Sequence, residues 1–123
     1  MPYKDKKIVV FGVSRYDDTK YGRKIFTALT HMGFEVYGIN PQGGMIEGRP
    51  LFPDLRALNV KPDVAIMVVQ PKVLVQAVQQ CLDAGVGEIW FQPGSRLEEA
   101  YHLATSCGIK AIESCFMMEN KFW

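Results

Sequence analysis

The stretch Ile8-Val9-Val10-Phe11-Gly12-Val13-Ser14-Arg15 decides the fold class of this 123-residue chain. Its first half is a continuous apolar run rich in β-branched residues, which is typical of a strand buried on both faces of a parallel sheet. A polar loop follows, and apolar residues then recur at helical spacing from Ile25 to Met32, where Gly33 ends the pattern. The sequence therefore predicts a strand, a glycine turn and a helix.

Further segments carry the same apolar pattern of buried strands. They are Glu35–Ile39, Val64–Val69, Glu88–Phe91 and Ile109–Ile112. Because helical or turn-rich segments separate them, we expect one α/β domain over residues 1–123. The predicted architecture is a Rossmann-like, doubly wound parallel sheet of about five strands with helices on both faces. The expected strand order is 3-2-1-4-5, in which the third strand lies beside the second.

Helices are predicted after the third and fourth strands. One begins at Pro71, a residue that suits the first position of a helix. The next has its apolar face within Leu97–Ala104, and Ser95 with Glu98 resembles a capping box at its start. Only a short helical turn, at Pro53–Leu58, is expected between the second and third strands.

Composition excludes several classes of protein. Apolar residues make up 48% of the chain and charged residues 22%, as in a folded globular domain. The 14 basic and 13 acidic residues leave a net charge of +1, so neither nucleic acid nor a membrane surface is an expected partner. No apolar run approaches the roughly 20 residues of a membrane span, and the N-terminus has no secretory pattern.

The cysteines indicate a reducing environment. There are three, and none forms a C-x-x-C motif, so neither a disulfide framework nor a zinc site is expected. The expected location is the cytoplasm. Cys81 and Cys107 fall on apolar helix faces and are predicted to lie in the core. Cys115 is either a buried, inert thiol or a neighbour of the binding edge described next.

Unusual residues collect in the loops that follow the predicted strands. The carboxyl ends of parallel strands share one edge of a sheet, where ligands bind at the point of reversed strand order. The loops at this edge are residues 12–15 continuing to 20–23, 40–44, 70–72 and 92–95. The loops at the opposite edge resemble ordinary helix ends. This asymmetry predicts a single binding edge.

The first of these loops has the composition of a phosphate site. Gly12 has no side chain and would let the backbone approach a ligand, while Ser14 offers a hydroxyl and an N–H group. Tyr21-Gly22 leads into a helix whose free N–H groups and dipole favour an anion. Positive charge is added by Arg15, Lys20 and Arg23. The alternative interpretation is a glycine turn with solvated charges.

The same loops disfavour NAD. The dinucleotide fingerprint G-x-G-x-x-G has a glycine where this chain has Ser14. It also has an acidic residue at the end of the second strand, where this chain has Asn40 followed by Pro41. No P-loop motif occurs.

A set of short motifs spans residues 7–119. They are G-V-S-R at 12–15, Y-G at 21–22, V-Y-G-I-N-P at 36–41, Gly48, P-D-L at 53–55, D-V-A-I from 63, Pro71, W-F-Q-P-G at 90–94, E-E-A at 98–100, and Cys115 with Glu119. In order and spacing the chain resembles the CoA-binding domain family. This Rossmann-like module also forms the amino-terminal domain of the succinyl-CoA synthetase α subunit.

The resemblance implies that coenzyme A or an acyl-CoA binds, and it implies roles for particular residues. The diphosphate would lie at the first loop and helix, with the candidate residues Gly12, Val13, Ser14, Arg15, Lys20, Tyr21 and Gly22. Adenosine would be bordered by Asn40 and Pro41 on one side and by Val69, Gln70 and Pro71 on the other. The pantetheine arm would pass Gln92 and Gly94.

The chain departs from the family pattern at one loop. Synthetase-type chains often carry a basic residue after the second strand, where this chain has Gln42-Gly43-Gly44. The contact to the 3′-phosphate of the ribose is therefore unassigned. The substitutes open at this stage are Arg15, Lys20, Arg23 and Lys72.

The resemblance also implies a binding module that is not an enzyme. In the synthetase, the phosphorylated histidine lies in a second domain and a partner subunit handles the nucleotide, and this chain has neither. His31 is expected to cap the first helix away from the binding edge, and His102 to lie on the surface. Asp17-Asp18 is expected to be a solvated pair of loop acids. If coenzyme A binds, its thiol could form a mixed disulfide with Cys115 under oxidation.

Three functions remain open from the sequence. The first is a coenzyme A-binding or acyl-CoA-binding module. The second is an NAD(P)-type nucleotide-binding regulator or oxidoreductase-related module that uses the same edge. The third is an interaction subunit with a vestigial nucleotide site. A homo-oligomer or an unidentified protein partner is compatible with each. The apolar tail from Glu113 to Trp123 would cover the sheet edge or form a subunit contact.

Overall fold

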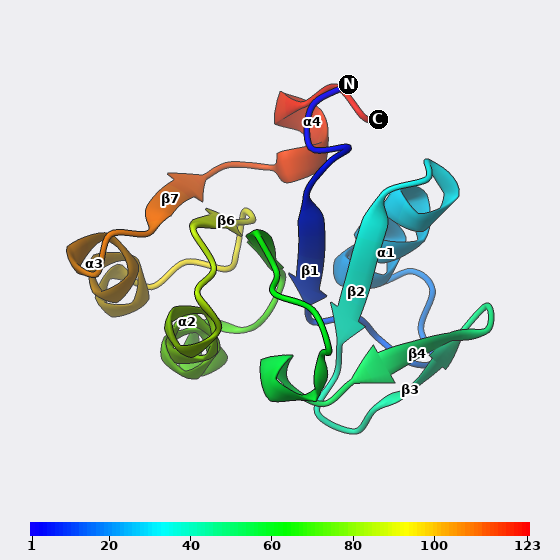
Figure 1. The fold of residues 1–123 in the computed structure, drawn as a ribbon, viewed down its shortest axis with the longest axis horizontal. Coiled ribbons are helices and arrows are strands. Elements are labelled where there is room, and N and C mark those ends of the chain that lie inside the picture. Colours follow the sequence, from blue (N-terminus) through cyan, green and yellow to red (C-terminus); the bar gives the residue numbers. More distant parts are fainter.

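The computed structural model describes residues 1–123, and all seven strands belong to one sheet with the order β3-β4-β2-β1-β5-β6-β7 (Figure 1). Every neighbouring pair is parallel except β3 and β4, which are antiparallel. The predicted strands correspond to β1 (Lys7–Phe11), β2 (Glu35–Ile39), β5 (Val64–Met67), β6 (Glu88–Phe91) and β7 (Lys110–Glu113). The predicted α/β class is confirmed, and a hairpin adds two strands.

Helices cover both faces of the sheet. Figure 1 shows α1 (Tyr21–His31) on one face and α2 (Pro71–Ala84) with α3 (Glu98–Ser106) on the other. The doubly wound arrangement is therefore confirmed. Pro71 occupies the first turn of α2, as predicted. No helix combines the length and the hydrophobicity that crossing a membrane requires.

Both faces of the central strand are buried, which explains its continuous apolar sequence. Ile8 and Val10 belong to the core cluster that α1 covers. Val9 and Phe11 belong to the cluster that α2 and α3 cover. All four side chains are at most 4% exposed. A strand with no polar face can only lie between two apolar layers, so the run at residues 8–11 determines a three-layer fold.

The predicted strand order is wrong at one position. The third predicted strand, β5, pairs with β1 and not with β2. The place beside β2 is taken by β4 (Arg49–Phe52), which pairs with β3 (Gly44–Ile46). Between β2 and β5 the chain forms only this hairpin and the short 3-10 helix η1 (Leu55–Ala57). Because β4 already occupies the outer side of β2, the next strand pairs with the free side of β1.

The C-terminal tail packs on the face of the sheet that α1 covers. It contains α4 (Phe116–Glu119), a helix that the sequence analysis did not predict. The Phe116 ring lies 5.0 Å from that of Tyr3 and 5.1 Å from that of Trp90, measured between centroids. The first and last residues consequently lie close together in Figure 1. The tail therefore covers this face of the sheet, whereas the sequence suggested the sheet edge or a subunit contact.

Candidate functional site

Four parallel strands end in register at one edge of the sheet. Phe11 at the end of β1 pairs with Ile39 of β2 and with Met67 of β5, and Met67 pairs with Phe91 of β6. The loops that leave these strands therefore begin side by side. This confirms that the four loops singled out from the sequence share one edge.

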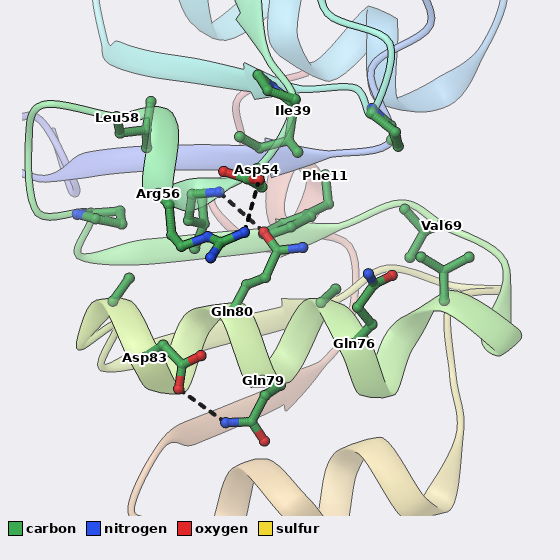
Figure 2. A pocket seen from close by; sticks show the side chains of 18 of the residues that line it. Phe11, Ile39, Asp54, Arg56, Leu58, Val69, Gln76, Gln79, Gln80 and Asp83 are labelled. Atoms are coloured by element: carbon green, nitrogen blue, oxygen red, sulfur yellow. Dashed lines mark hydrogen bonds and ion pairs between the residues drawn. The ribbon is translucent and has the colours of Figure 1, made fainter.

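The strand order reverses between β1 and β5, and a cavity of about 1060 Å³ opens there. From β1 the chain crosses to α1 on one face, and from β5 it crosses to α2 on the other. Such divergence leaves a crevice outside the strand ends. This end of the cavity is mainly apolar and is lined by Phe11, Gly12, Ile39, Pro41, Val69 and Val73 (Figure 2). Apolar walls of this kind suit a flat aromatic ring.

The cavity continues between η1 and α2, where its lining becomes polar. Gln76, Gln79, Gln80 and Asp83 lie along α2 on this side, and Figure 2 shows the hydrogen bond from Gln79 to Asp83, 3.0 Å long. This part of the site was not predicted from the sequence. The signal was present, because polar residues three and four apart share one face of a helix.

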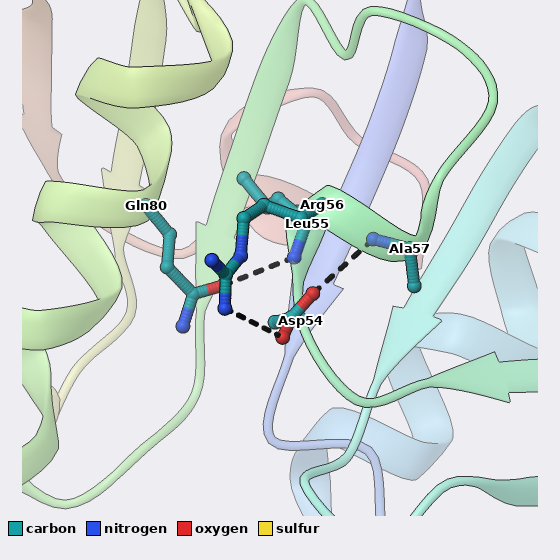
Figure 3. Close-up of polar contacts among 5 residues, drawn as sticks. All are labelled: Asp54, Leu55, Arg56, Ala57 and Gln80. Carbon is teal, nitrogen blue, oxygen red and sulfur yellow. Dashed lines mark hydrogen bonds and ion pairs between the residues drawn. The ribbon is translucent and has the colours of Figure 1, made fainter.

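A small network of hydrogen bonds fixes the position of η1 against α2 (Figure 3). The side-chain oxygen of Gln80 accepts a hydrogen bond from the Leu55 backbone N–H at 3.1 Å. Asp54 caps η1 by accepting from the Ala57 N–H at 3.2 Å, and it lies 3.8 Å from the Arg56 guanidinium. The short helix η1, which forms the wall of the cavity opposite α2, is thus held by Gln80 of α2 and by its own N-cap residue Asp54.

Gly12 is required by the protein itself, and not by ligand approach alone as the sequence analysis expected. Its φ is +92°, and a Cβ atom at this position would lie 1.9 Å from the Val68 carbonyl oxygen. Gly22 is similarly constrained, because its Cβ would lie 2.3 Å from the Gly12 carbonyl oxygen. The two glycines bring β1, α1 and the loop after β5 into direct backbone contact.

The loop after Gly12 presents backbone donors without acceptors. Gly12 and Val13 donate to the Ile39 carbonyl oxygen, but the N–H groups of residues 14, 15 and 16 donate to no atom of the protein. The start of α1 has no side-chain cap, and its N-cap residue is Lys20. Ser14 accepts a hydrogen bond from the Asp17 N–H at 3.1 Å. Consecutive free N–H groups beside a helix N-terminus favour an anion.

The two arginines of this region have different positions. Arg23 donates through Nη1 to the carbonyl oxygens of Ser14 and Arg15, at 3.2 Å each, so it holds the loop in shape. Arg15 donates through Nη1 to Gln42 Oε1 at 3.3 Å and through Nη2 to the Tyr16 hydroxyl at 2.7 Å. The ion pairs of the molecule are His31–Glu47, Arg56–Asp54 and Arg96–Glu113, so neither arginine has a carboxylate partner.

Asn40 and Pro41 lie where the loop after β2 meets the loop after β1. The Asn40 side chain donates to the Val13 carbonyl oxygen at 3.0 Å and accepts from the Gln42 N–H at 2.9 Å. Pro41 lines the apolar end of the cavity. Both predicted residues are therefore beside the cavity, but the Asn40 amide is already used to shape the two loops.

The loops after β5 and β6 are joined by Ser95, whose predicted role is wrong. Ser95 is 4% exposed, and its hydroxyl both accepts from the Val69 N–H and donates to the Val69 carbonyl oxygen. It therefore forms no capping box, and α3 begins after the N-cap residue Leu97. Of the remaining candidates in these loops, Val69 lines the cavity, whereas the exposed residues are Gln70, Pro71 and Gly94.

Gln92 and Cys115 lie on the α1 side of this edge. Gln92 is 1% exposed, and its side-chain oxygen accepts from the Phe116 N–H at 2.7 Å. Cys115 is 7% exposed, and its sulfur lies 3.7 Å from the Tyr21 hydroxyl. Burial acts to raise the pKa of the Cys115 thiol, but hydrogen bonds with Gln92, with the backbone at Met118 and with Tyr21 outweigh it and lower the pKa.

The remaining candidates for chemistry are apart from the cavity. His31 ends α1 and pairs with Glu47 at 2.8 Å, and His102 is exposed on α3. Asp17-Asp18 is exposed, as predicted. Cys81 is buried as predicted, but Cys107 is exposed, because it is the C-cap residue that follows α3 and does not lie on the apolar face of that helix. No group of three or more His, Cys, Asp or Glu side chains is placed to hold a metal ion.

Comparison with known proteins identifies the family. The sequence profile of the CoA binding domain family matches residues 6–121. The chain belongs to the CoA-binding domain family. The resemblance found from the sequence motifs is thus confirmed over nearly the whole chain.

Relatives of this CoA-binding domain include parts of ligases. It is 30% identical to an ADP-forming acetate–CoA ligase of Archaeoglobus fulgidus, over 94% of this chain and 18% of that protein. It is 31% identical to a subunit of the ADP-forming sulfoacetate–CoA ligase of Bilophila wadsworthia, over 89% of this chain and 39% of that subunit. The chain therefore spans less than half the length of either relative.

A solved structure of similar size has the same fold. A conserved hypothetical protein of Pyrococcus furiosus is 36% identical, with a TM-score of 0.83, and the match covers 93% of this chain and 98% of that one. The arrangement of strands and helices described above is thus shared with a relative of about the same length.

Proposed function

We propose that this chain binds coenzyme A or an acyl-CoA at the carboxyl edge of its sheet and carries out no chemistry of its own. The observation that carries the proposal is the crevice between β1 and β5. There an apolar cavity, lined in part by Gly12, adjoins the loop whose residues 14–16 have free N–H groups. The first suits an adenine ring, and the second suits a diphosphate.

In this proposal each part of the coenzyme has a place. Adenine lies at the apolar end of the cavity, between Pro41 and Val69. The diphosphate accepts hydrogen bonds from the loop at residues 14–16 and from the start of α1. The pantetheine arm runs toward the loop after β6, past Gln92 and Gly94. The family membership and the relatives among CoA ligases support coenzyme A as the ligand.

The residue at the end of β2 supports coenzyme A over NAD. A dinucleotide site of the usual kind has a carboxylate there, which accepts hydrogen bonds from both ribose hydroxyls. Asn40 has no carboxylate, and its amide is occupied by Val13 and Gln42. The chain therefore lacks the carboxylate that would make this site specific for NAD.

The absence of catalysis is also part of the proposal. His31 and His102 are remote from the cavity, and neither has a nucleophile beside it. We propose that this chain supplies the coenzyme site and that a protein partner supplies the chemistry. Formation of an acyl-CoA from a carboxylate, ATP and coenzyme A by the purified chain alone would overturn this part.

Ligand titration tests the binding proposal. Thermal unfolding is measured with coenzyme A, dephospho-coenzyme A, NAD and ATP. At 100 times the dissociation constant, a ligand bound only by the folded state stabilises it by about 2.7 kcal/mol, which raises the melting temperature by several degrees. We expect coenzyme A to give the largest rise at equal concentration. A larger rise with NAD, or none with coenzyme A, would refute the proposal.

A pair of variants tests where the ligand binds. Val73→Asp places a carboxylate in the apolar end of the cavity, where it would repel the diphosphate and disfavour adenine. Val75→Asp is the matched control, because Val75 is half-buried on the same helix but does not line the cavity. We expect only Val73→Asp to abolish the response to coenzyme A, with melting temperatures without ligand as the reference for each variant.

A further inference from the structure

The loop beside the proposed adenosine position has no cation of its own. Coenzyme A carries a phosphate on its ribose, at the 3′-position, which dephospho-coenzyme A lacks. The loop that follows β2 contains Gln42-Gly43-Gly44, and none of these residues is charged. A phosphate with a charge of about −1.5 to −2 is bound well only when a cation or several donors face it. For this loop the cation must come from another element.

Arg15 reaches this loop from the loop after β1. Its guanidinium donates to Gln42 Oε1 at 3.3 Å, across 27 positions of sequence. Its side chain also lies directly over Gly44, because a Cβ atom on Gly44 would be 2.9 Å from Arg15 Nε and 3.0 Å from Arg15 Cγ. The missing side chain at Gly44 thus makes the space in which Arg15 lies.

The contacts of Arg15 position its charge without neutralising it. Both partners are neutral oxygens, those of Gln42 and of the Tyr16 hydroxyl. The Tyr16 ring lies under the guanidinium carbon, at 4.8 Å from the ring centroid. No carboxylate is within 4.0 Å. A phosphate at this loop would exchange the long bond to Gln42 for a charge-assisted bond, and the planar guanidinium can form two at once.

The other cations are less well placed. Arg23 Nη1 is bound to the carbonyl oxygens of Ser14 and Arg15, behind the loop. The side chains of Lys20 and Lys72 are exposed and make no hydrogen bond, so nothing fixes either of them against residues 42–44. Among the four candidates, only Arg15 is held at the loop after β2.

We propose that Arg15 selects coenzyme A over dephospho-coenzyme A by binding the 3′-phosphate, with Gly44 providing the space for its side chain. The inference rests on the proposed function and assigns Arg15 to the ribose phosphate. From the sequence, Arg15 was placed at the diphosphate and was also one of four unranked candidates for the 3′-phosphate. Because the diphosphate is common to both ligands and the 3′-phosphate is not, the two assignments give different results.

The test is isothermal titration of the wild type, Arg15→Gln and Lys72→Gln with the two ligands. We expect the wild type to bind coenzyme A about 10- to 100-fold more tightly than dephospho-coenzyme A, the range of a charge-assisted hydrogen bond. Arg15→Gln should lose most of this ratio through weaker binding of coenzyme A alone. Lys72→Gln removes an exposed charge in the first turn of α2 and should keep the ratio.

The ratio within one variant also controls for folding, since any loss of folded protein affects both ligands equally. A second variant, Gly44→Ala, should lower the ratio by displacing the Arg15 side chain, and its melting temperature shows whether it is folded. If Arg15→Gln weakens both ligands equally or keeps the ratio, the assignment to the 3′-phosphate is wrong and the proposed function stands. If the wild type binds neither ligand, the proposed function itself fails.

Discussion

At the scale of single residues, the site depends on places where side chains are absent. A Cβ atom on Gly12 would clash with the Val68 carbonyl oxygen, and one on Gly22 would clash with the Gly12 carbonyl oxygen. The sequence correctly indicated that Gly12 is special, because a glycine directly after a buried strand is a turn signal. It could not indicate the reason, since Val68 is more than 50 residues away in the chain and only the β1–β5 pairing brings the two together.

Replacing Gly12 by alanine should destabilise the fold strongly. The new Cβ would lie 1.9 Å from a backbone oxygen, and φ is +92°. Gly108→Ala is the matched control, because φ is +86° there but no atom lies within 4 Å. We expect a loss of about 1 kcal/mol for Gly108→Ala from backbone strain, and at least about 2 kcal/mol more for Gly12→Ala. Urea unfolding measures both, and equal losses would contradict the clash.

At the scale of elements, contacts between loops hold the binding edge together. Ser95 joins the loop after β6 to Val69 at the end of β5 through two hydrogen bonds to one backbone unit. The sequence around Ser95 matched a capping box, because a serine followed three residues later by Glu98 is the usual pattern. Local spacing could not show that Ser95 is buried beside another strand, so the prediction failed for a long-range reason.

Ser95→Ala should lower the free energy of unfolding by about 1–3 kcal/mol, because it leaves the partly buried N–H and carbonyl oxygen of Val69 without their partner. Ser106→Ala is the control, since Ser106 is exposed and its hydroxyl contacts only the nearby Leu103 carbonyl oxygen and the adjacent Cys107 sulfur. Urea unfolding should show little change for that variant. A similar loss in both would mean that the contact with Val69 is not what stabilises the edge.

The N-terminal segment is fastened to β6 by a second contact between elements. Glu88 accepts hydrogen bonds from the Tyr3 hydroxyl and from the Trp90 indole N–H, so the Trp90 indole finds the partner that a buried indole needs. Burial and the bond to Glu88 raise the pKa of Tyr3 to about 12. Burial and Glu35 raise the pKa of Tyr37 to about 12 as well.

These shifts predict how stability changes in alkaline solution. A phenol whose pKa is higher in the folded state keeps its full contribution to stability below about pH 10, the unfolded value. The contribution is lost as the pH rises from about 10 toward 12, because the unfolded state releases its proton first. Urea midpoints between pH 9 and 12 should therefore fall less steeply in Tyr3→Phe than in the wild type. An unchanged slope would contradict the role of the Tyr3–Glu88 bond.

At the scale of the whole molecule, the sequence predicted the features that follow from the spacing of apolar residues along the chain. The five parallel strands, the helices that alternate with most of them and the common edge of the loops follow from apolar runs and glycines. The β3–β4 hairpin was missed because Pro50 and the glycines around it indicate a turn by every local rule. The strand order and the polar half of the cavity were missed because they depend on which distant segments pair.

The closure of the molecule by its tail gives a further prediction. Phe116 is fully buried and contacts the rings of Tyr3, Trp90 and Phe122. Phe116→Ala should cost about 3–5 kcal/mol, as for other buried aromatic side chains. Met118, in the same short helix, is 63% exposed, so Met118→Ala should change the free energy of unfolding by about 0.5 kcal/mol or less. Comparable losses would mean that α4 does not cover the core.

The unpartnered N–H groups after Gly12 also bear on how such a pocket persists through evolution. Every residue type except proline has a backbone N–H, so nearly any replacement at positions 14–16 keeps the donors. Substitution of those side chains can change the affinity and selectivity for the ligand while the backbone donors to the anion remain. Homologues that differ at most positions can therefore keep the same anion site, because the backbone conformation and not the side chains determines its geometry.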